Sequence, residues 1–284
     1  MPLFRPALYF LSMMLCGGAL LAVPEGARAQ GKLDAQYMVT LAGMPIGKGR
    51  WLVDISEDRF SAAASGAAAG VLRLFASGDG MSSSQGAMVG GAPVSTGFVA
   101  TVNTAKTKEE FRIRMESGDA KEVIVTPPPP PDNARVPLTD AHRRGVKDPM
   151  TASLIAVPGK GGLIGPQACP ASLPVFDGRY RYDIQLAFKR VDQIIADKGY
   201  SGGTVVCGIT FVPIAGYVPD KPALKYVTAL RDMEVWLAPI AGTRVMVPYR
   251  VAIPTPLGPG IMQATEFVST ASPRAKAASA KPPQ

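Results

Sequence analysis

The chain has 284 residues, of which 47% are hydrophobic and 18% charged, and its formal net charge is +8. This is enough apolar material for one large domain and too much for a globally disordered chain. Glycine (30 residues) and proline (27 residues) are abundant, which excludes a long helical bundle or coiled coil because both residues break helices. The single histidine, His142, excludes most histidine-based catalytic and metal-binding chemistry.

The N-terminal segment is typical of a secretory signal peptide. Arg5 precedes an apolar run that ends at Val23, and Ala27 and Ala29 provide the small residues that precede a cleavage site. We therefore expect cleavage between Ala29 and Gln30, followed by a periplasmic location. The apolar run is of marginal length for a membrane span, so a retained N-terminal anchor is the alternative.

Alternation of apolar and polar residues recurs along the remaining chain and predicts about ten strands. The clearest case is the segment 179–189, which places five large apolar side chains on one face: Tyr180, Tyr182, Ile184, Leu186 and Phe188. Strands with one polar face are typical of an antiparallel sheet. Asp177 and Gly178 precede this segment and predict a tight type I′ hairpin.

Helical patterns are sparse. Asp148 followed by Pro149 is an N-cap with proline at the first helical position, which predicts a short helix reaching Ala156. A weaker candidate covers residues 67–76. The expected fold is therefore mainly β, with one large, strongly curved antiparallel sheet, open or half-barrel, and one or two short helices packed on its concave face.

The proline-rich stretch sets the expected domain organisation. Residues 127–131 are all proline and must form a stiff polyproline II segment. An interdomain linker is one interpretation, but each half has too few strands to close on itself, so a crossing within one sheet is preferred. We expect a signal peptide at 1–29, a single curled β-sheet domain at 30–268 and a disordered tail at 269–284. Within the domain, halves 31–126 and 148–268 are joined by a crossing at 127–147.

Two cysteines follow the expected signal peptide, Cys169 and Cys207. An exported chain enters an oxidising compartment, so an even pair predicts one disulfide bond. Two free, buried thiols are the alternative. The chain has no Cys-x-x-Cys sequence, which argues against a redox enzyme.

The sequence contains no catalytic motif, and no cofactor or metal site is predicted. His142 lies in a charged loop. The carboxylates that could serve a hydrolase have no spacing that singles out a pair: Asp177, Asp183, Asp192, Asp232 and Glu234. Part of the positive charge lies in the expected tail, so the folded body is too weakly basic to indicate nucleic-acid binding. A peripheral, non-specific contact with an anionic membrane surface is the most that this charge implies.

Several motifs follow one another in a characteristic order. They are Lys147 to Ala152 (KDPMTA), Leu173 to Tyr182 (LPVFDGRYRY), Val247 to Val251 (VPYRV), Thr255 to Gly258 (TPLG) and, near the N-terminus, Gly43 to Gly47 (GMPIG). Together they resemble the exported bacterial proteins of domain-of-unknown-function family 3108, over residues 33–268. The resemblance implies a periplasmic, β-rich protein and no activity. The run of prolines departs from it.

Two functional hypotheses follow. The first is a non-enzymatic envelope protein that binds a lipid or other hydrophobic ligand or contributes to envelope integrity. Its basis is the predicted long sheet, because a sheet with one uncovered apolar face is typical of a binding surface. In that case Tyr180 and Tyr182 line the mouth of a groove, with Ile184, Leu186 and Phe188 deeper. A closed core is the alternative for this face. The second hypothesis is a hydrolase of the envelope that depends on carboxylates or on a metal.

Overall fold

The computed structural model describes residues 30–70 and 78–272. The expected signal peptide, residues 1–29, lies outside the described residues. Strands make up most of the rest: β1 (Gly31–Leu41), β2 (Met44–Ile55), β3 (Arg59–Ala68), β4 (Gly78–Val89), β5 (Ala92–Thr104), β6 (Lys108–Glu116), β7 (Asp119–Thr126), β8 (Ile155–Ala156), β9 (Leu173–Phe176), β10 (Arg181–Ile195), β11 (Lys198–Gly199), β12 (Ser201–Ala215), β13 (Met233–Pro239), β14 (Val245–Thr255) and β15 (Gly258–Ala271).

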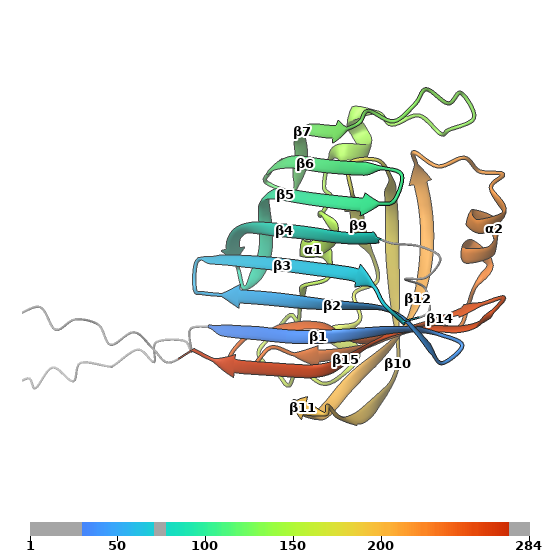
Figure 1. Cartoon of the computed structure of the whole chain (residues 1–284). Coiled ribbons are helices and arrows are strands. Elements are labelled where there is room, and N and C mark those ends of the chain that lie inside the picture. Colours follow the sequence, from blue (N-terminus) through green and yellow to red (C-terminus); the bar gives the residue numbers. More distant parts are fainter. Residues whose placement is uncertain (1–29, 71–77, 273–284) are drawn as a thin grey trace, which may run out of the picture.

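Within residues 30–70 and 78–272 the helices are few and short. They are the α-helices α1 (Pro149–Ala152) and α2 (Pro222–Ala229) and the 3-10 helices η2 (Asp140–Arg143) and η3 (Pro166–Ala168). In the part of the chain that the structure describes, no helix is long and apolar enough to cross a membrane. Helix α2, which the sequence analysis did not predict, lies beside β12 at the periphery (Figure 1).

The helix expected after Asp148 begins as predicted. The Asp148 carboxylate accepts the backbone N–H of Thr151 at 2.9 Å, and Pro149 occupies the first helical position. The helix ends earlier than expected because the chain passes into β8, which pairs with β14. The weaker candidate at 67–76 is only partly described: β3 continues to Ala68, and residues 71–77 lie outside the described residues.

The expected mainly β fold with one large antiparallel sheet is confirmed. The strand order is β7-β6-β5-β4-β3-β2-β1-β15-β14-β13-β12-β10-β9, so the two halves of the chain share one sheet through the pairing of β1 with β15 (Figure 1). Within β15, Ala271 pairs with Gly31. The ordered sheet thus extends three residues past the expected boundary at 268, and residues 273–284 of the expected tail lie outside the described residues.

The segment after the prolines bridges the two ends of the sheet. Val146 donates its backbone N–H to Gly118 beside β7 at 2.7 Å, and Lys147 donates to Pro174 of β9 at 2.8 Å. Phe176 of β9 in turn donates to the Lys147 carbonyl at 2.9 Å. This segment therefore nearly closes the sheet into a barrel, although β7 and β9 do not pair with each other.

The inside of the barrel is filled. Helix α1 lies against β4 and β5 on the concave face (Figure 1). Met150 and the following Leu154 are buried there. One apolar cluster includes Leu33, Val53, Phe60, Phe98, Ile113, Met150, Leu154, Phe176, Val245, Val247 and Phe267. A second includes Ile155, Val157, Leu186, Val205, Cys207, Leu237 and Met246. Strand β14 contributes alternate residues to both clusters, so its beginning is buried on both faces.

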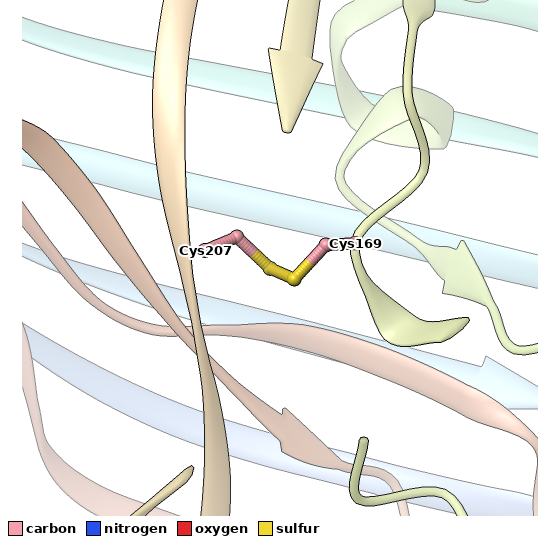
Figure 2. Close-up of a disulfide and its surroundings, with 2 residues drawn as sticks. All are labelled: Cys169 and Cys207. Carbon is pink, nitrogen blue, oxygen red and sulfur yellow. A yellow bond between two sulfur atoms is a disulfide. The ribbon is translucent and has the colours of Figure 1, made fainter. Parts of the chain in front are cut away.

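The disulfide bond predicted from the sequence is confirmed. Cys169, directly after η3, is joined to Cys207 in the middle of β12, with 5.8 Å between their Cα atoms (Figure 2). Cys207 is fully buried in the second cluster. The bond thereby fixes the loop that precedes β9 to β12 within this cluster.

Removing this bond is expected to destabilise the protein. The bridged residues are 38 positions apart, and a loop of that size restricts the unfolded chain enough to account for about 2–4 kcal/mol. In the double variant Cys169→Ala/Cys207→Ala, the melting temperature should fall by several degrees, which calorimetry would detect. Equal melting temperatures for the variant and the oxidised wild type would contradict this expectation.

Candidate ligand-binding site

The five residues predicted to line a groove on β10 do not share one environment. Leu186 is buried in the cluster that contains the disulfide, and Ile184 packs at the margin of that cluster. Phe188 is exposed and precedes a β-bulge that interrupts the pairing of β10 with β12. The apolar face of β10 is therefore divided between a closed core and the surface.

The two tyrosines of this set also differ. Tyr182 packs against Phe211, with 5.3 Å between ring centroids, and burial raises the pKa of its hydroxyl, with the Asp177 and Asp148 carboxylates adding to the effect. Tyr180 stacks on Tyr217 at 4.3 Å. Tyr180 also lies at the rim of a small cleft of about 310 Å³, whereas Tyr182 does not line that cleft.

The turn before β10 differs from the expected type I′ hairpin. The pairing of β9 with β10 ends at Phe176 and Arg181, and of the turn residues only Gly178 has a positive φ, at 98°. The type I′ expectation is wrong because the Asp177 side chain organises a longer loop: its Oδ1 accepts the backbone N–H groups of Arg179 (2.8 Å) and Tyr180 (2.7 Å). Burial raises the pKa of Asp177, and these two N–H groups oppose the rise.

The carboxylates considered for a hydrolase are mostly engaged in structural contacts. Asp183 pairs with Arg181 at 2.5 Å, Asp192 accepts the indole N–H of Trp236 at 2.8 Å, and Glu234 pairs with Lys189 at 2.9 Å. Asp232 is exposed. Among the described residues, no group of three or more histidine, cysteine, aspartate or glutamate side chains could hold a metal ion.

A large groove lies on the outer face of the first half of the sheet, and its volume is about 990 Å³. Small residues on neighbouring strands form its floor: Ala63 on β3, Ser83 on β4 and Gly97 on β5. Leu52 of β2, Val99 of β5 and Ile124 of β7 stand above this floor and are between 37% and 49% exposed. The groove therefore combines a shallow floor with apolar sides.

Strand register explains why these residues meet. Side chains alternate between the two faces of a sheet, and one row of cross-strand partners consists of Asp34, Leu52, Ala63, Ser83, Val99, Arg112 and Ile124. The neighbouring row faces the core and consists of Leu33, Val53, Ala62, Ser84, Phe98 and Ile113. The small side chains of β3 and β4 fall in the middle of the outer row, between larger ones on both sides.

Charged residues around this outer groove are neutralised in pairs. Lys32 lies 2.7 Å from Asp54, and Arg114 lies 3.2 Å from Glu122. Beside them, Arg50 lies 2.6 Å from Asp34, and its hydrogen bond holds the pKa of that carboxyl below its ordinary value. The rim is polar but carries little net charge.

The sequence analysis did not predict this groove. Its signal is the run of small residues in two adjacent strands, Ser61 to Ser65 (SAAAS) and Ser82 to Ser84 (SSS). Such runs weaken the apolar–polar alternation that indicates strands, so a single sequence gives no clear sign that they form a site. The groove becomes visible only when the register places both runs side by side.

A nearly closed, antiparallel sheet with a filled interior and a grooved outer face defines the class of this protein. The chain belongs to the family described as "Protein of unknown function (DUF3108)", whose model matches residues 36–265; the resemblance seen in the motifs is thereby confirmed. No curated protein matches the chain. A solved structure that is similar is the crystal structure of a beta-barrel-like protein of domain of unknown function DUF1849 from Brucella abortus, with 8% identity and a TM-score of 0.47, covering 85% of this chain and 98% of that chain.

Proposed function

We propose that this protein is a non-enzymatic binding protein of the cell envelope that holds a hydrophobic or amphiphilic ligand in the outer groove. The observation that carries the proposal is the groove itself, with its volume of about 990 Å³ and its apolar sides. Small-molecule sites have volumes of about 300–1,000 Å³ and are lined by apolar groups with a few polar ones. The groove has these properties, whereas the concave face is occupied by core side chains.

The paired rim charges support a particular class of ligand. Fully paired charges such as Lys32 with Asp54 offer little attraction to a strongly charged molecule, but they can accept or donate hydrogen bonds at the edge of the groove. An acyl chain between Leu52 and Val99 with an uncharged or zwitterionic head at the rim fits this arrangement. The proposed location is the periplasm, and the disulfide bond supports it because such bonds persist in oxidising compartments.

Filling the groove is expected to weaken ligand binding without unfolding the protein. Ala63 is exposed on the floor, so Ala63→Trp introduces bulk where a ligand would lie and leaves the core untouched. We expect the affinity for a fluorescent hydrophobic dye, measured by titration, to fall at least about tenfold, equivalent to about 1.4 kcal/mol. The melting temperature should remain close to that of the wild type.

The matched control is Gln185→Trp. Gln185 is also exposed on a strand, but it belongs to β10, away from the groove. This variant adds the same side chain to the surface and should bind the dye as the wild type does. Equal binding by wild type and Ala63→Trp would contradict the proposal, as would loss of binding in both variants.

A further inference from the structure

One long strand of the sheet has a free edge. β10 pairs with β12 along its length, but β9 pairs only with its first four residues, Arg181 to Ile184. Leu186 donates its N–H to Pro170 at 3.2 Å. Beyond this point, in the ranges that the structure describes, no strand pairs with the second edge of β10. The far end of this hairpin lies at the border of the molecule, next to β11 (Figure 1).

The backbone groups that face this edge can be identified. The backbone N–H of Ala196 donates to the Tyr200 carbonyl across the β10–β12 hairpin at 2.9 Å. The backbone carbonyl of Asp192 accepts the Thr204 hydroxyl from the β12 side at 3.2 Å. The backbone N–H and C=O groups of the even-numbered residues from Asp192 to Ala196 thus face β12. In an antiparallel ladder the direction alternates, so the N–H and C=O groups of Val191, Gln193 and Ile195 face the free edge.

The free edge also exposes large apolar side chains. Phe188, Val191 and Ile195 are 40%, 44% and 82% exposed. Edge strands are usually protected by proline, by exposed charges or by short length. β7, at the other end of the sheet, is followed directly by the five prolines, whereas β10 is long and contains no proline. An edge with these properties favours pairing with another strand.

The charges on this edge do not oppose such pairing. Arg190 forms two hydrogen bonds with Glu234, at 3.0 and 3.1 Å, and a third with Asp192 at 3.1 Å. Lys189 also contacts Glu234, at 2.9 Å. Two positive and two negative groups therefore compensate one another within a single molecule.

We propose that the free edge of β10 pairs with the same edge of a second copy of this chain. The two strands are antiparallel, and Val191 lies on the twofold axis. This register places Arg190 opposite Asp192 of the second copy, twice by symmetry. A shift that moved the axis to Asp192 would instead place two aspartates opposite each other. Opposite charges, exposed apolar residues and free backbone groups thus all match in one self-complementary arrangement, as a twofold interface requires.

The mass of the protein in solution tests this proposal. We expect light scattering after size-exclusion chromatography to give the mass of a dimer for the wild type. Val191→Pro removes an N–H that faces the free edge and leaves the β10–β12 ladder intact, so its mass should be halved. Val191→Glu, which places two like charges at the axis, should have the same effect and serves if the proline variant does not fold. A monomeric wild type, or a folded variant of either kind that stays dimeric, would overturn the proposal.

A cysteine at the axis gives an independent readout. Directly opposed residues in a hydrogen-bonded antiparallel pair have Cα atoms about 5.5 Å apart, within the range of a disulfide bond. Oxidised Val191→Cys should therefore run as a covalent dimer on a non-reducing gel. Leu257→Cys, on an exposed turn between β14 and β15, should remain largely monomeric. Equal cross-linking of both variants would show random collision and contradict the proposed axis.

Discussion

Replacing Asp148 with alanine is expected to destabilise the protein by about 3–5 kcal/mol. Asp148 is fully buried inside the barrel. Its carboxylate accepts the Thr151 N–H at 2.9 Å, the Thr151 hydroxyl at 2.7 Å and the Ser84 hydroxyl at 3.1 Å. Alanine removes the cap of α1, which accounts for about 1–2 kcal/mol. It also deprives buried hydroxyls of an acceptor, at about 1–3 kcal/mol for each group left unsatisfied.

Urea unfolding of matched variants would measure this effect. Asp148→Asn retains an oxygen that can cap the helix and should lose less stability than Asp148→Ala. Asp220→Ala removes an exposed carboxylate that pairs with Lys225 and should unfold at the wild-type urea concentration, because exposed pairs contribute little. If Asp148→Ala were as stable as Asp220→Ala, the buried cluster would not hold α1 against β4.

Replacing Tyr182 with alanine is expected to cost about 3 kcal/mol, the lower end of the range for truncation of a large packed aromatic side chain, because Tyr182 is half-buried. The ring of Tyr182 packs against Phe211, and burial is the main cause of the raised pKa of its hydroxyl. The substitution therefore leaves a gap beside Phe211. It should leave binding to the outer groove unchanged under conditions where the variant remains folded.

Phe188→Ala is the natural control for this experiment. Phe188 belongs to the same predicted face of β10 but is exposed, so its truncation should change stability by about 1 kcal/mol or less. Denaturant unfolding and dye titration should be carried out on both variants. A stable Tyr182→Ala variant that has lost dye binding would contradict the packed-core role of Tyr182 and would place the ligand on the concave face.

Local signals in the sequence predicted many of the elements and a strongly curved sheet, but not that the sheet nearly closes. The N-cap at Asp148 depends only on neighbouring residues, so it could be identified directly. The disulfide bond could be predicted because only two cysteines follow the expected signal peptide. The near closure of the barrel depends on hydrogen bonds such as Val146 to Gly118, between residues whose approach no periodicity encodes. Period-2 alternation also placed Leu186 and Phe188 on one face, but the bulge after Phe188 and the loop held by Cys169 decide which of them is buried.

The outer groove also could not be predicted from the sequence alone. An exposed Ala63 or Ser83 is unremarkable in a single sequence, because small polar and apolar residues occur on many surfaces. Their importance arises from the pairing of Ala63 with Ser83 and of Leu52 with Ala63, which aligns small residues between larger ones. A groove formed by small side chains can be identified only once the register of the sheet is known.

The proposed ligand-binding role is tested most directly by identifying what the protein carries. Wild type and Ala63→Trp should be purified in parallel from the periplasmic fraction, extracted with organic solvent and analysed by mass spectrometry. We predict that a hydrophobic or amphiphilic molecule accompanies the wild type in near-stoichiometric amount and is strongly depleted from Ala63→Trp. A wild type that carries no such molecule, or equal amounts in both proteins, would contradict the assignment of the outer groove as a ligand-binding site.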